Sequence, residues 1–66
     1  MKVRSLVAFL EQHGCVPKRT CGSHRMYELP NGTVVPVVVN HLNAEVGRDV
    51  LASVRRALRH ARMKVP

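Results

Sequence analysis

The side chains of this 66-residue chain that could do chemistry are few, and the clearest candidate is His24. It follows Gly22-Ser23, a pair typical of a tight turn, so we expect its imidazole at the start of a strand. Imidazole titrates close to neutral pH and can take or give a proton there. This placement predicts a general acid or base at the edge of a sheet.

Basic residues surround this position in the sequence and favour a phosphodiester substrate. Lys18 and Arg19 precede the turn, Arg25 follows His24, and we expect all three, with Ser23, to contact phosphate. RNA carries its own nucleophile, because a base can remove the 2′-hydroxyl proton and the oxygen then attacks the adjacent phosphorus. Cations stabilise the charge that gathers on the phosphoryl oxygens. This route needs no metal and no cofactor. The alternative is that His24 only caps a backbone carbonyl in the turn.

The sequence lacks the residue patterns that other catalytic mechanisms need. The four acidic residues are scattered along the chain, which argues against paired-carboxylate hydrolysis and two-metal nuclease chemistry. No glycine-rich phosphate loop is present. His13, Cys15, Cys21 and His24 carry zinc-ligand side chains, but their spacing does not match the pairs of finger-like sites. Two ordinary thiols are the favoured interpretation, and zinc is a minor alternative.

Size and charge point to one small domain with a polyanionic partner. The 7.4 kDa chain has 11 Lys and Arg against 4 Asp and Glu, a net charge of +7 and a pI near 10.8. We expect residues 1–66 to form a single domain with a thin core. Apolar residues make up 45% of the chain, which argues against disorder. One Phe, one Tyr and no Trp cannot supply the aromatic platform of RRM or OB-type RNA readers.

The sequence predicts a cytoplasmic protein that makes no membrane contact. Its longest apolar run, residues 34–39, is too short to span a bilayer. The apolar stretch at residues 6–10 is too short for a signal-peptide core. Two cysteines make no disulfide framework, which favours a reducing compartment.

Periodicity predicts five elements: a helix over 4–13, strands over 15–20, 24–29 and 33–39, and a helix over 46–63. Gly14 is a natural residue to end the first helix, and Pro-Asn-Gly at 30–32 indicates a hairpin. Pro17 and Pro36 place the first and third strands at the edges of the sheet, with the second strand central. The expected fold is α+β, in the order α-β-β-β-α, with two helices on one face of a three-stranded antiparallel sheet.

The last predicted helix carries an excess of positive charge. Arg48, Arg55, Arg59 and Arg62 line one flank, and Asp49 is the only acidic residue from residue 46 onward. We expect this flank to contact an anion, either RNA or an acidic protein face. Among the remaining residues, Tyr27 is interpreted as packing on a sheet face, and the valine-rich third strand either belongs to the core or contacts a partner.

Three stretches resemble the HicA toxin family of mRNA interferases: Gly-Ser-His-Arg-Met-Tyr at 22–27, Pro-Asn-Gly at 30–32, and the valine strand that leads to His41. A fourth stretch, with Gly47, Leu51, Val54 and Arg55, fits the pattern of that family's last helix. The similarity covers roughly residues 1–59. Arg25 stands where many members carry a second histidine.

The resemblance implies a fold like the double-stranded-RNA-binding domain and an endoribonuclease that cuts mRNA, with His24 at the position of the catalytic histidine. It also implies a HicB-like antitoxin partner. Two other functions remain open from the residues alone: an RNA-binding module of the same fold without catalysis, and a small basic subunit ordered by a partner protein. The role of His41 also stays open.

Overall fold

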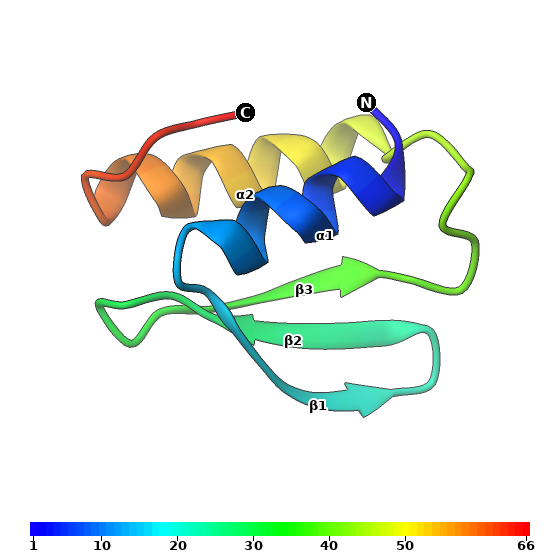
Figure 1. Cartoon of the computed structure of the whole chain (residues 1–66), viewed down its shortest axis with the longest axis horizontal. Helices are drawn as coiled ribbons and strands as arrows, with labels where there is room; N and C mark the ends of the chain where they lie inside the picture. The colour runs from blue at the N-terminus through cyan, green and yellow to red at the C-terminus, as the bar shows by residue number, and fades with distance from the viewer.

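The computed structural model describes residues 1–66 and has the predicted order of elements. Helix α1 (Val3–Gln12) is followed by strands β1 (Val16–Cys21), β2 (His24–Glu28) and β3 (Val34–Val38), and helix α2 (Arg48–His60) comes last. Figure 1 shows both helices on the same side of the sheet. The α+β prediction and its α-β-β-β-α order are therefore confirmed. No helix is long and apolar enough to cross a bilayer.

Both helices end in the same hydrogen-bonded motif. At the end of α1, the Cys15 N–H donates to the Leu10 carbonyl (2.9 Å), and Gly14 takes a positive φ of 84°. At the end of α2, the Met63 N–H donates to the Leu58 carbonyl (2.9 Å), and Arg62 has a φ of 57°. These are Schellman caps, in which a left-handed residue satisfies the last carbonyls. The cap at Arg62 stops α2 at His60, three residues before the predicted end.

The sheet is antiparallel in the order β1-β2-β3, so β2 is central as predicted. The Leu29 N–H donates to Thr33 (2.7 Å) and the Val39 N–H donates to Ser23 (2.9 Å), and both pairs lie in the register of β2 with β3. Because hydrogen-bonded pairs alternate along an antiparallel ladder, the nitrogen of Pro36 faces the open edge. A proline is tolerated there because no ladder donor is required.

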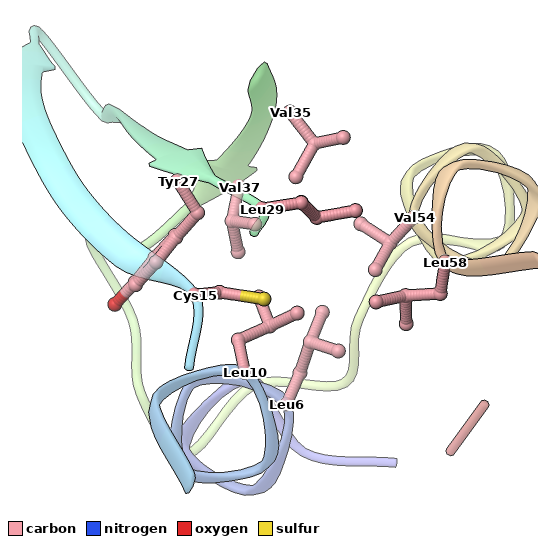
Figure 2. Close-up of a cluster of buried hydrophobic side chains, with 9 residues drawn as sticks. All are labelled: Leu6, Leu10, Cys15, Tyr27, Leu29, Val35, Val37, Val54 and Leu58. Carbon is pink, nitrogen blue, oxygen red and sulfur yellow. The ribbon is translucent and has the colours of Figure 1, made fainter. Parts of the chain in front are cut away.

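The core lies between the helices and one face of the sheet (Figure 2). Side chains alternate between faces along a strand, so Tyr27 on β2 and Val35 and Val37 on β3 point toward the helices. Leu6 and Leu10 of α1, with two buried residues of α2, pack against them. His24, Met26 and Glu28 therefore belong to the opposite face, which no helix covers.

Candidate functional site

His24 is the first residue of β2 and lies on the uncovered face of the sheet. The residue is exposed, and its ring takes part in none of the side-chain hydrogen bonds or ion pairs of the chain. A ring packed inward would have been unable to meet a substrate. The imidazole is thus accessible to a ligand approaching the sheet from the side away from the helices.

The turn before His24 holds the start of the strand in place. Gly22 and Ser23 form the two-residue loop between Cys21 and His24, which are paired in the β1–β2 register. Gly22 has a φ of 61°, and Ser23 has no positive φ, as in a type II′ hairpin turn. The Ser23 carbonyl accepts the Val39 N–H at 2.9 Å, which fastens the turn to the end of β3.

Residues of both neighbouring strands share the face of His24. Cys21 on β1 and Val38 on β3 are its direct partners in register. Arg19 pairs with Met26 and so is a diagonal neighbour of His24, at about 7–8 Å by general strand geometry. Arg19 is exposed, and its guanidinium can reach a phosphate held beside the imidazole. Of the predicted basic neighbours of His24, Arg19 is the one that the register brings close.

Lys18 and Arg25 are placed differently from what their positions in sequence suggested. The register of β1 with β2 shifts between Pro17 and Arg19, and the Lys18 Nζ lies 3.3 Å from Glu28 Oε1, at the far end of β2 from His24. Arg25 is on the helix side of the sheet, because consecutive residues of a strand face opposite ways. Neither is brought together with His24.

Arg25 belongs instead to a small polar cluster at the rim of the core. Its Nη1 donates to the Tyr27 hydroxyl (3.3 Å), which donates to Glu11 Oε2 in α1 (2.8 Å). Burial raises the pKa of the Tyr27 hydroxyl, and the hydrogen bond from Arg25 opposes that rise. Tyr27 is fully buried and packs in the core, consistent with the role interpreted from the sequence.

The arginines predicted on the last helix occupy different surroundings. Arg48 begins α2 and is exposed. Arg55 is half-buried, and its Nε donates to the Pro66 carbonyl at 3.2 Å. Arg59 is exposed in the last turn, and Arg62 lies beyond the helix, where it takes the left-handed conformation after the cap residue Ala61. Arg48 therefore presents a free guanidinium, whereas part of Arg55 is already used within the chain.

The residues of the possible zinc string do not converge on one site. The Nδ1 of His13 donates to the Phe9 carbonyl (2.8 Å), and the ring stacks on that of Phe9 at 4.1 Å between centroids. Cys15 is buried in the core, whereas Cys21 and His24 are exposed on the uncovered sheet face. No three His, Cys, Asp or Glu side chains form a group that could hold a metal ion.

The two thiols should therefore differ in reactivity. Cys15 is 2% exposed and Cys21 is exposed, so a thiol reagent such as DTNB should label Cys21 at once in the folded protein and Cys15 only after unfolding. Mass spectrometry of partly labelled protein measures both rates. Equal labelling of the two residues in the folded state would contradict the placement of Cys15 in the core.

The burial of Cys15 also predicts a loss of stability at alkaline pH. Burial raises the pKa of the Cys15 thiol, because the folded protein favours the neutral form. The contribution of the neutral thiol to the free energy of unfolding is therefore complete below the pKa of an unfolded thiol, about 8.5, and is lost as the pH rises through the folded pKa. Urea unfolding at pH 7 and pH 10 measures how much the free energy of unfolding falls between the two pH values. This fall should be smaller for Cys15→Ala than for the wild type or Cys21→Ala. Tyr27, whose pKa is also raised by burial, adds its own loss at higher pH in all three. An identical decrease in Cys15→Ala and Cys21→Ala would be the contrary result.

The structure adds one neighbour that the sequence analysis did not single out. Cys21 stands directly opposite His24, because a two-residue hairpin loop always pairs the residues that flank it. The position of Cys21 could therefore have been predicted once Gly22-Ser23 was assigned to a turn. The position of Val38, the other direct partner, could not, because it depends on the register of β3 with β2.

Comparison with known proteins identifies the family. A family model described as the HicA toxin of bacterial toxin–antitoxin systems matches residues 3–63, which include all five elements and the Gly-Ser-His turn. Comparisons with curated proteins and with solved structures gave no match. Because the matched region is nearly the whole chain, the chain belongs to the HicA family of toxins of bacterial toxin–antitoxin systems.

Proposed function

We propose that this toxin is a metal-independent endoribonuclease that cleaves mRNA through the 2′-hydroxyl, with His24 as the general acid or base. The observation that carries the proposal is the exposed, unpartnered imidazole at the start of β2, held by the Gly22-Ser23 turn. Arg19 on the same face supports it, since a cation beside the reacting phosphate stabilises the transition state. Membership in the HicA family supports the same activity and implies a HicB-type antitoxin as the partner.

The reaction transfers one proton through the imidazole. His24 accepts the 2′-hydroxyl proton while the oxygen attacks the adjacent phosphorus, and the bond from phosphorus to the 5′-oxygen breaks. The imidazolium then returns a proton to the leaving oxygen, as acid–base histidines do. The products are a 2′,3′-cyclic phosphate and a 5′-hydroxyl. Arg19 and the Ser23 backbone or hydroxyl are proposed to hold the reacting phosphate, and Arg48 is proposed to hold another phosphate of the same RNA strand.

The direct test compares RNA and DNA of the same sequence in the presence of EDTA. Purified toxin should fragment the RNA and leave the DNA intact, because DNA lacks the 2′-hydroxyl. A DNA strand with a single ribonucleotide should be cut only after that nucleotide. Intact RNA under these conditions, or equal cutting of DNA, would count against the proposed chemistry and favour a protein that binds RNA without cleaving it.

RNA binding by this basic chain should weaken steeply with salt. For single strands, the logarithm of the binding constant falls by about 0.7 per phosphate contact for each tenfold rise in salt. Three contacts, from Arg19, Arg48 and one further cation, would give a slope of about −2 by the same rule. Fluorescence anisotropy with His24→Ala and a labelled RNA measures the slope without cleavage, and Arg19→Gln should reduce it by about one contact. A complex that is indifferent to salt would favour a role in protein contacts alone.

A further inference from the structure

A cavity lies at the same end of the molecule as His24. Figure 1 shows the β1–β2 turn, the segment between β3 and α2, and the N-terminus at one end of the fold. The cavity has a volume of about 330 Å³ and is enclosed by the end of β3, residues 40–47 and the first turns of both helices. Val38, the partner of His24 in register, is one of its lining residues. Val37 and Val50 also line it, so the cavity lies on the helix side of the sheet, and an RNA strand bound at His24 would reach it by passing around the end of β3.

The wall of this cavity is built by backbone pairing between residues 1–3 and residues 44–46. The Val3 N–H donates to the Ala44 carbonyl (2.9 Å), and the Val46 N–H donates to the Met1 carbonyl (2.9 Å). The Lys2 Nζ donates to the Asn43 carbonyl (2.9 Å). These hydrogen bonds hold residues 43–46 in place, although these residues belong to no helix or strand. The cavity is therefore bounded by ordered backbone.

The lining combines apolar walls with two unengaged polar side chains. Val46 and Val50, both half-buried, supply accessible apolar surface over the buried Val3 and Val37, and the polar side chains are those of Asn40 and His41. Neither Asn40 nor His41 makes a side-chain hydrogen bond within the chain, and both are exposed. An apolar pocket with a few convergent polar groups is typical of a site for a small flat ligand.

The acidic residue of the lining is already neutralised. One oxygen of Glu45 accepts from the Met1 amino group at 3.1 Å, and the other lies 3.8 Å from the Lys2 Nζ. The hydrogen bond from the amino group holds the pKa of this carboxyl below its usual range. Exposed Arg48 follows the lining residue Gly47 and makes no ion pair within the chain, so it provides a cation beside the lining that suits a phosphate backbone.

We propose that this cavity receives one nucleobase of the RNA, that of a nucleotide next to the cleaved phosphate. The inference rests on the proposed nuclease function and assigns a specificity site to it. The base would lie between valine side chains, with Asn40 and His41 hydrogen-bonded to its edge. Aromatic stacking has no part in this, because Tyr27 is in the core and Phe9 stacks on His13. Such a site gives a preference for certain bases at one position of the substrate.

The test fills the cavity and compares cleavage-site preferences. Val50→Phe adds a ring to a half-buried lining residue, and Ala52→Phe adds the same ring to an exposed position of the same helix. Each variant cleaves a randomised single-stranded RNA library, and sequencing of the products gives the base preference on both sides of the cut. The wild type and Ala52→Phe should share a preference of about tenfold at one position, the size of a single apolar discrimination. Val50→Phe should lose it and raise KM more than it lowers kcat.

Asn40→Ala and His41→Ala provide a second route if Val50→Phe fails to fold, because both residues are exposed. Each should weaken the same preference by removing a hydrogen bond to the base edge. Unchanged preference and KM in all folded cavity variants would overturn the inference while leaving His24-dependent cleavage intact. Loss of antitoxin binding with an unchanged cleavage profile would also overturn it, since the cavity would then hold a partner side chain.

A titration with AMP, GMP, CMP and UMP separates this inference from the nuclease proposal. In NMR spectra of the toxin, a nucleotide in the cavity should shift the backbone amides of Asn40, His41 and Val50. These shifts should disappear in Val50→Phe and persist in Ala52→Phe. If the wild type cleaves no RNA, the nuclease proposal fails, and the titration alone shows whether a nucleotide binds in the cavity. Shifts confined to other parts of the chain would reject the cavity as a base site.

Discussion

RNA cleavage by His24→Ala should fall by about 10²–10⁴ relative to the wild type, the usual contribution of an acid–base side chain. The free energy of unfolding should barely change, because the ring is exposed and makes no hydrogen bond within the chain. RNA binding should remain within a few-fold of the wild type, since one exposed imidazole adds little to a complex dominated by phosphate contacts. Single-turnover cleavage, anisotropy and urea unfolding measure the three quantities separately.

His60→Ala is the matched control for this experiment. His60 is also exposed, but it lies at the end of α2, which is on the covered side of the sheet. Its replacement should leave the cleavage rate within a few-fold of the wild type. If binding and cleavage fall together in His24→Ala, the histidine is a structural or binding residue. Expression in cells gives a parallel result: arrest of growth by the wild type should be relieved by His24→Ala and kept by His60→Ala.

Tyr27→Ala should cause the largest loss of stability in the chain. Tyr27 is fully buried and carries a large share of the core that joins β2 to α1. Removing a buried aromatic side chain costs about 3–5 kcal/mol, through lost burial and the cavity left behind. The core of a chain of this size rarely supplies more than about 3–5 kcal/mol of net stability, so the variant should be partly or wholly unfolded. Urea unfolding followed by circular dichroism measures the loss.

Tyr27→Phe separates packing from hydrogen bonding at the same position. The ring is kept, but Arg25 Nη1 and Glu11 Oε2 lose the hydroxyl between them. The expected cost is about 1.5–3 kcal/mol, because both lost hydrogen bonds join the hydroxyl to a charged group, with cleavage close to that of the wild type. A folded Tyr27→Phe variant without cleavage would mean that the hydroxyl takes part in catalysis, contrary to its placement on the helix side of the sheet.

The fold was predictable because local signals agreed with one another. Gly14 indicated the end of α1, and Pro17 and Pro36 indicated that β1 and β3 are the edge strands. The structure confirms both predictions. The end of α2 could not be predicted in the same way, because the left-handed cap residue is Arg62 rather than glycine. The next residue, Met63, packs against the core, and this long-range contact has no local signal in the sequence.

The surroundings of His24 were predicted less well, for two physical reasons. Adjacent residues of a strand face opposite ways, so Arg25 could have been assigned to the helix side once β2 was recognised. The shift in register beside Lys18 has no such signal, and it turns that side chain toward Glu28. The pairing of the N-terminal segment with residues 44–46 joins distant parts of the chain, and so the cavity beside β3 was not foreseen.

The most direct measurement of the central claim is the chemical structure of the ends that the toxin produces. A defined RNA is incubated with the toxin in EDTA, and the fragments are weighed by mass spectrometry. The account predicts 2′,3′-cyclic phosphate and 5′-hydroxyl ends, formed by the wild type and not by His24→Ala. Fragments with 3′-hydroxyl and 5′-phosphate ends would show attack by water instead of the ribose hydroxyl, and would contradict the mechanism.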